Sequence, residues 1–183
     1  LMKPRMQWVA VAVSAAVLAA CGGGGADTTP ATAVTAVKVM GDSLADSGTF
    51  GLKFTVQGTA PTGAGSTAIW PERVAASYGR TLCPHYVSAG GSFSAKPDCT
   101  NYAVGGGRIN NFTAPTSPVS ILQQLKDAGA AGYATGDLVL IDGGGNDAAD
   151  LIGAYLGASR DGGKAYAALL GTVLDAATVN SLL

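Results

Sequence analysis

The sequence predicts an α/β fold built around a parallel β-sheet, and three observations support that prediction. Short apolar stretches alternate with helix-like stretches along the 183 residues. The apolar stretches at 35–40, 101–104 and 138–141 resemble strands that are covered on both faces of a sheet. Glycine or polar residues follow each of them directly, as in the loops at the carboxyl ends of parallel strands, where functional sites form.

The first half of the chain gives one strand, one helix and an insertion before the second strand. The expected strand 35–40 ends at Gly41, the first residue of the sequence GDSLADSG. A helix is expected from Pro71, since proline suits the first helical turn. Residues 80–100 contain two cysteines and are expected to form an irregular, stapled insertion.

The second half is expected to be mostly helical around the third strand. Ser117 and Pro118 are typical of a helix start, and Gly129 is typical of its end. A further helix is expected at 148–156, and another from 163 to the end of the sequence.

The first twenty residues have the pattern of a secretory signal. Lys3 and Arg5 precede an uncharged apolar run at 8–20, which is shorter than the ~20 residues of a membrane-spanning helix. The sequence LAAC at 18–21 resembles the bacterial lipobox, in which the cysteine, here Cys21, becomes the lipidated first residue after cleavage. A plain cleaved signal with an incidental cysteine is the alternative.

The expected organisation is therefore a signal at 1–20, a flexible Gly/Thr/Ala/Pro tether at 21–34 and one domain at 35–183. A lipid anchor implies a membrane partner and an exported, membrane-attached protein. Gly22 is not the aspartate that retains many such proteins at the inner membrane, which favours the outer membrane or cell surface.

Charge and cysteine usage exclude several function classes. The formal net charge is −1 and no basic block exists, which argues against a nucleic-acid partner. Cys83 and Cys99 are expected to form a disulfide in an exported chain, with two buried thiols as the alternative. Neither has a CxxC or histidine neighbour, so no zinc site and no cofactor is expected.

Three strand ends carry residues suited to acyl transfer from an ester. Ser43 follows the first strand and is a candidate nucleophile. The glycines at 105–107 allow backbone N–H groups to approach a substrate, and the Asn146 side chain offers an amide donor. Each residue alone is more often a cap or a turn residue, and only their combination in this order points to chemistry.

The three motifs closely resemble the first three blocks of the GDSL hydrolases, also called the SGNH family. GDSLADSG matches the first block, NYAVGGG at 101–107 the second and GGGND at 143–147 the third. The resemblance implies a three-layer α/β/α fold with a flavodoxin-like parallel sheet. It also implies that Ser43 is the nucleophile, and that Gly106 (with Gly105 as the neighbouring choice) and Asn146 are oxyanion donors.

The family's fourth element, an Asp-x-x-His pair that supplies the general base, is missing from this sequence. The single histidine, His85, lies between the first two blocks in LCPHYV, and Leu82 stands where the motif has aspartate. His85 is therefore expected to be a packing or surface residue. The expected fold is incomplete at its C-terminus, with the base downstream. The 183 residues alone are expected to be inactive or nearly so, since loss of a triad costs on the order of 10⁶ in rate.

The leading hypothesis is a lipid-anchored serine esterase or lipase that acts on lipid, short-chain or acetylated-sugar esters. The alternative is a non-catalytic surface lipoprotein that keeps the fold and binds acyl or glycan ligands. The sequence does not separate the three substrate classes.

Overall fold

The computed structural model describes residues 33–56 and 67–182. Contacts divide the chain into two units, Leu1–Ala33 and Val34–Leu183, and the description below concerns the second unit. The expected signal at 1–20, the lipobox cysteine Cys21 and nearly all of the tether lie outside the described residues. No helix within 33–56 and 67–182 is long and apolar enough to cross a bilayer.

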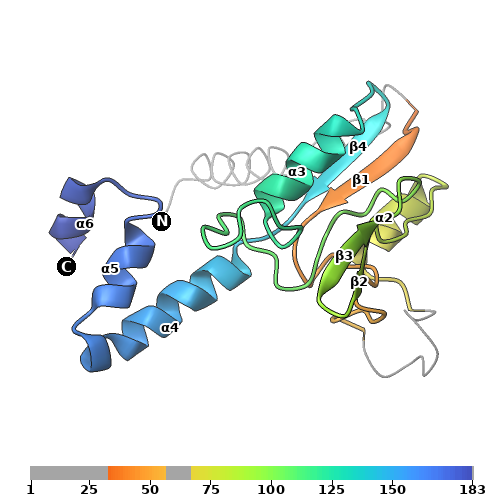
Figure 1. Cartoon of the computed structure of the whole chain (residues 1–183). Helices are drawn as coiled ribbons and strands as arrows, with labels where there is room; N and C mark the ends of the chain where they lie inside the picture. Colours follow the sequence, from red (N-terminus) through yellow and green to blue (C-terminus); the bar gives the residue numbers. More distant parts are fainter. Residues whose placement is uncertain (1–32, 57–66, 183) are drawn as a thin grey trace, which may run out of the picture. The chain divides into compact units, whose positions relative to one another are not determined.

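A parallel pair of strands forms the centre of the second unit, as the sequence predicts. β1 (Ala36–Met40) pairs with β4 (Asp137–Ile141), with Ala36 opposite Asp137 and Met40 opposite Ile141 (Figure 1). β1 is buried on both faces. The same expectation for β4 was wrong in the described part of the chain, because Val139 and Ile141 are 39% and 57% exposed.

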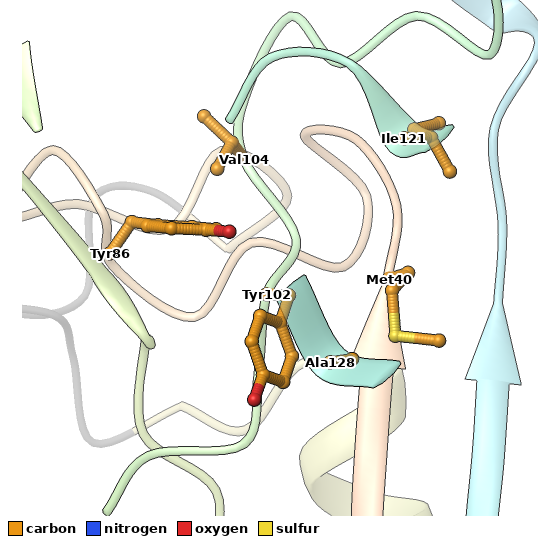
Figure 2. Packing of buried hydrophobic residues seen from close by; sticks show 6 residues of the cluster. All are labelled: Met40, Tyr86, Tyr102, Val104, Ile121 and Ala128. Carbon is orange, nitrogen blue, oxygen red and sulfur yellow. The ribbon is translucent and has the colours of Figure 1, made fainter. Parts of the chain in front are cut away.

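Alternate residues of β1 pack into two separate cores, one on each face of the sheet. Val37 and Val39 lie in one core with Ala75 of α2 (Trp70–Ser77). Met40 lies in the other, which α3 (Ile121–Ala130) closes. Figure 2 shows this second core, made of Met40, Tyr86, Tyr102, Val104, Ile121 and Ala128. A helix on each face of a parallel sheet is the expected α/β/α arrangement.

The stretch 101–104 runs beside β1 but does not form the second strand that the sequence predicts. The N–H groups of Tyr102 and Val104 donate to the carbonyls of Val39 and Gly41 at 2.7 and 3.2 Å, but these bonds form a single bridge, between Val39 and Asn101, and no continuous ladder. The N–H of Ala103, on the side away from β1, donates to the Asn101 side chain at 3.0 Å.

The cysteine-containing insertion is more regular than expected. β2 (Tyr86–Ala89) and β3 (Ser92–Ala95) form an antiparallel hairpin. Gly90 and Gly91 both have positive φ, as a two-residue type I′ hairpin turn requires. A disulfide joins Cys83 and Cys99 on either side of this hairpin.

α3 begins at Ile121, after an N-cap at Ser120, and not at Pro118 after a cap at Ser117 as expected. The backbone of Arg108 accounts for the difference. Its N–H donates to the carbonyl of Val119 at 3.0 Å, and its carbonyl accepts the N–H of Ile121 at 2.9 Å. These two bonds hold the chain extended immediately before the helix.

The C-terminal helices differ from the prediction in their bounds. α4 (Gly145–Asp161) is longer at both ends than the expected 148–156. The single helix expected from 163 onward is two helices, α5 (Lys164–Leu170) and α6 (Ala176–Leu182). Asp175 accepts the N–H of Thr178 at 2.9 Å at the start of α6, a helix-capping bond that favours a new start there.

Candidate active site

Ser43 lies in a tight turn just after β1. Asp42 closes this turn, because its carbonyl accepts the N–H groups of Ala45 and Asp46 at 3.1 and 3.0 Å. The Asp42 side chain also accepts the N–H of Leu44 at 2.9 Å. Ser43 is half-buried, and within the described residues neither its N–H nor its hydroxyl has a hydrogen-bond partner. Both groups are therefore available to a ligand.

Gly41, which precedes this turn, is fixed by buried polar groups. The fully buried Gln124 of α3 accepts the N–H of Gly41 at 2.8 Å and donates to its carbonyl at 3.1 Å. A β-carbon at position 41 would lie 1.6 Å from Oδ1 of Asp142, so any other residue here would displace the Asp142 carboxylate. α3 thus holds the start of the serine turn through the two backbone groups of one residue.

The glycines of the second block form a β-turn. The N–H of Gly107 donates to the carbonyl of Val104 at 2.9 Å, and Gly106 has φ +81°, as the third residue of a type II turn requires. The N–H of Gly105 donates to Oδ2 of Asp46 at 2.8 Å. The N–H of Gly106 has no hydrogen-bond partner in the described part of the chain.

This turn lies directly against the serine turn. A β-carbon at position 107 would be 2.7 Å from the carbonyl oxygen of Gly41 and 3.2 Å from the Cα of Asp42. The backbones approach so closely that the position accepts only glycine. The first two blocks therefore meet at the carboxyl end of β1.

The third block, at the start of α4, also contacts the glycine turn beside Ser43. Asn146, in the first turn of α4, donates from Nδ2 to the carbonyl of Gly107 at 2.8 Å. Asp147 accepts the N–H groups of Ile109 and Asn110 at 3.0 and 3.1 Å. All three sequence-predicted strand ends are thus connected by direct contacts.

An ion pair ties α4 to the second block as well. Nε and Nη2 of Arg108 donate to the two carboxylate oxygens of Asp150 at 2.5 and 2.9 Å, and Nη1 donates to the carbonyl of Gly106 at 2.9 Å. The Arg108 guanidinium lowers the pKa of the Asp150 carboxyl, mainly through this hydrogen bonding. Arg108 thus holds the carbonyl group of Gly106 in place, while the N–H of Gly106 has no partner in the described residues.

Asp142, at the end of β4, is the group with the most altered acidity near the serine turn. Burial raises the pKa of its carboxyl to about 6, and the neighbouring charge of Asp42 adds to the rise. Hydrogen bonds from the N–H of Asp42, at 3.2 Å, and from the Trp70 side chain oppose it. This carboxyl takes up a proton in mildly acidic solution.

His85 is held by packing and by a backbone contact. The residue is 9% exposed, and its ring stacks on Tyr102 with centroids 4.1 Å apart and makes a 2.9 Å contact from Nδ1 to the carbonyl of Cys99. No hydrogen bond joins it to Ser43, although both residues are described. Within 33–56 and 67–182 no cluster of His, Cys, Asp or Glu could hold a metal ion.

An open cavity adjoins the serine turn. It has a volume of about 350 Å³ and is lined by Leu44, Thr55, Val56, Ala68, Ile69, Trp70 and Arg73. Leu44 directly follows Ser43, and its side chain is 54% exposed. The walls are mostly apolar, which suits a hydrocarbon group.

Three residues for which the sequence predicted no role organise this site, namely Asp46, Asn101 and Gln124. All three are fully buried, and each binds the backbone of a loop that carries a candidate site residue. Asp46 stands before Ser-Gly, a typical turn pattern that could have singled it out. No local sequence pattern of this kind indicated a role for Gln124.

Comparison with known protein families agrees with the fold. Residues 37–175 match the family model of the GDSL-like lipases and acylhydrolases. The chain belongs to this family, which makes it a hydrolase of the general esterase and lipase type. No curated protein and no solved structure matches the chain.

Proposed function

We propose that this protein hydrolyses carboxylic esters with Ser43 as the nucleophile. The observation that carries the proposal is the junction of the three blocks, above all the Asn146 bond to Gly107 at 2.8 Å beside the serine turn. Within 33–56 and 67–182 the hydroxyl and N–H of Ser43 and the N–H of Gly106 have no hydrogen-bond partner, which supports the proposal. These groups are the nucleophile and the donors that acyl transfer needs.

In the proposed reaction the Ser43 oxygen attacks the ester carbonyl carbon and transfers its proton to a base. The oxyanion accepts hydrogen bonds from the N–H groups of Ser43 and Gly106 and from the second N–H of the Asn146 amide. Collapse of this intermediate expels the alcohol, which takes the proton from the base. Water then attacks the acyl-serine and releases the acid.

The base is proposed to be the histidine of an Asp-x-x-His pair located downstream of residue 183. His85 is poorly placed for this role, because its ring is buried, stacked on Tyr102 and bound to the carbonyl of Cys99. The 183 residues without such a pair are proposed to be nearly inactive.

The apolar cavity beside Leu44 is proposed to hold the acyl chain of the substrate. Its volume of about 350 Å³ lies within the usual range of ligand pockets. This favours esters of alkyl acids over acetylated sugars.

The test of the nucleophile compares Ser43→Ala with Ser47→Ala in the protein produced from its complete gene. Ser47 is a matched control, because it lies in the same loop and its buried hydroxyl has no hydrogen-bond partner among the residues that the structure describes. Ester hydrolysis and labelling by a fluorophosphonate should vanish in Ser43→Ala and persist in Ser47→Ala. An active Ser43→Ala would refute the proposal. A protein that folds and binds esters without turnover would support the non-catalytic alternative.

We also propose the lipid-anchored organisation, with a signal at 1–20, lipidation at Cys21, a tether at 21–34 and the hydrolase domain at 35–183. The proposal rests on the sequence pattern alone. Cys21→Ser should abolish labelling with palmitate and release the protein from outer-membrane fractions. Unchanged membrane association of this variant would contradict it.

A further inference from the structure

Asp46 is the most completely satisfied buried acid near the candidate site, and the reaction outlined above does not use it. It is 0% exposed. Its Oδ1 accepts the N–H groups of Gly48 and Thr49 at 2.9 and 2.7 Å, within its own loop. Its Oδ2 accepts the N–H of Gly105 at 2.8 Å, in a different block of the sequence.

The bond to Gly105 decides which backbone donor remains open in the glycine turn. Gly105 and Gly106 follow each other in this turn and each carries one N–H. Asp46 occupies the first of these, while the second has no partner in the described residues. Arg108 holds the carbonyl of Gly106 at 2.9 Å, which limits rotation of the turn from the other side.

We propose that Asp46 is a positioning residue that selects the N–H of Gly106 as the oxyanion donor and fixes it relative to Ser43. This inference rests on the function proposed above. Since Asp46 lies three residues after Ser43, one rigid loop carries both the nucleophile and the anchor of the turn. Thermal motion of the two loops then moves the nucleophile and the donor together.

Asp46→Asn tests the proposal with a side chain of the same shape. The two bonds to Gly48 and Thr49 favour keeping the amide oxygen on that side. The amide –NH₂ then faces the N–H of Gly105, and two donors cannot bond. The glycine turn should shift while the serine loop keeps its form.

The expected result in the complete protein is a fall in kcat of about ten- to hundredfold with KM changed less than about threefold. Affinity for a boronic acid that forms a tetrahedral adduct with Ser43 should fall by a similar factor. Asp127→Asn is the matched control. It also removes a carboxylate acceptor, which binds Tyr86 at 2.5 Å and Gln123 at 2.7 Å, but it touches neither loop. Its kcat should stay within about twofold of wild type.

A second measurement needs no variant. In the wild-type protein, the amide proton of Gly105 should exchange slowly before and after the boronic acid binds. The amide proton of Gly106 should exchange quickly in the free protein and become protected in the adduct.

Two results would overturn the proposal. One is an Asp46→Asn variant with unchanged kcat while Ser43→Ala is inactive, which would leave the proposed function intact. The other is protection of Gly105, and not of Gly106, on adduct formation. An active Ser43→Ala would instead remove the function on which the inference rests.

Discussion

The side-chain amide of Asn146 donates a 2.8 Å hydrogen bond to the carbonyl oxygen of Gly107. The amide nitrogen carries two hydrogens, so this bond orients the group and leaves one N–H available. Asn146 thus links the third block to the second and also presents a donor at the same place.

Replacing Asn146 with Asp should therefore remove activity without loss of fold. A carboxylate cannot donate, and it would repel both an oxyanion and the carbonyl of Gly107. We expect kcat to fall by about 10²- to 10³-fold, the usual cost of one oxyanion donor. Steady-state ester hydrolysis measures this, with Asn110→Asp as the control. In the described part of the chain the Asn110 side chain binds only the carbonyl of Thr172, at 3.4 Å. Equal losses in both variants would count against a specific role.

Gln124 should matter more for stability than its neighbour Gln123. Gln124→Leu leaves the buried N–H of Gly41 without an acceptor. It also removes one of the two hydrogen bonds to the carbonyl of Gly41, which keeps the bond from the N–H of Val104 at 3.2 Å, and the bond to the half-buried carbonyl of Pro118. An unsatisfied buried group costs about 1 to 3 kcal/mol and a lost bond about 1 kcal/mol, so the free energy of unfolding should fall by about 3 kcal/mol. Gln123→Leu loses a single bond, to Asp127, and should cost about 1 kcal/mol. Denaturant titration compares the two, and similar losses would show that the Gly41 bonds contribute little.

The disulfide should stabilise the part of the fold that supports the serine turn. Asn101 donates from Nδ2 to the carbonyl of Ala45 at 2.8 Å, and its own N–H donates to the carbonyl of Cys83 at 3.2 Å. Replacing Cys83 and Cys99 with Ser opens a loop of sequence separation 16 and should cost about 3 kcal/mol. Tm should fall by about 6 to 12 °C. A reductant should lower the Tm of wild type and leave that of the double variant unchanged; equal Tm values under both conditions would contradict this.

The features predictable from the sequence are those set by local pattern. The apolar run 35–40 predicts a strand buried on both faces, and the structure places Val37 and Val39 in one core and Met40 in the other. Family membership is likewise visible in three short motifs that follow strand positions.

The features that escaped prediction depend on partners far away in the chain. Asp46 binds a backbone group 59 residues away, and Gln124 binds one 83 residues away. α3 starts at Ile121 and not at the expected Pro118, because Arg108 pairs with the preceding segment. No local pattern encodes such contacts, since any polar side chain on a loop or helix face is compatible with solvent.

Asp142 gives a test that depends on pH. Its pKa is about 6 in the fold against 3.8 as the ordinary value, so the folded state binds the proton more tightly. The wild-type protein therefore loses stability as pH rises from about 4 to 6, and this loss is complete above about 6. Asp142→Asn cannot ionise, so its stability relative to wild type should rise over this range. After allowance for solvent screening, the gain should be about 1 to 2 kcal/mol.

Asp150→Asn provides the opposite control for this pH dependence. Hydrogen bonding to Arg108 lowers the pKa of Asp150, so its carboxylate stabilises the fold above its ordinary pKa and loses that effect in acid. Its replacement should cost stability at neutral pH and little in acid. Denaturant titrations from pH 3.5 to 7.5 compare the variants, and the same slope for both would contradict the raised pKa of Asp142.

Leu44 should influence which acyl chains the enzyme prefers. It lines the cavity of about 350 Å³ beside Ser43, and its side chain is 54% exposed, so Leu44→Ser should leave the fold unchanged. Loss of its contact with an alkyl chain removes about 1 to 1.5 kcal/mol of apolar burial. The kcat/KM for an octanoyl ester should then fall about five- to tenfold, with little change for an acetyl ester.

The matched control for Leu44 is Leu122→Ser on α3, where the leucine is 48% exposed and away from the cavity. Its ratio of octanoyl to acetyl activity should equal that of wild type. If Leu44→Ser also keeps the wild-type ratio, the acyl chain lies elsewhere and the cavity does not select the substrate. If both esters lose activity equally, Leu44 acts on the geometry of Ser43 and not on the acyl chain.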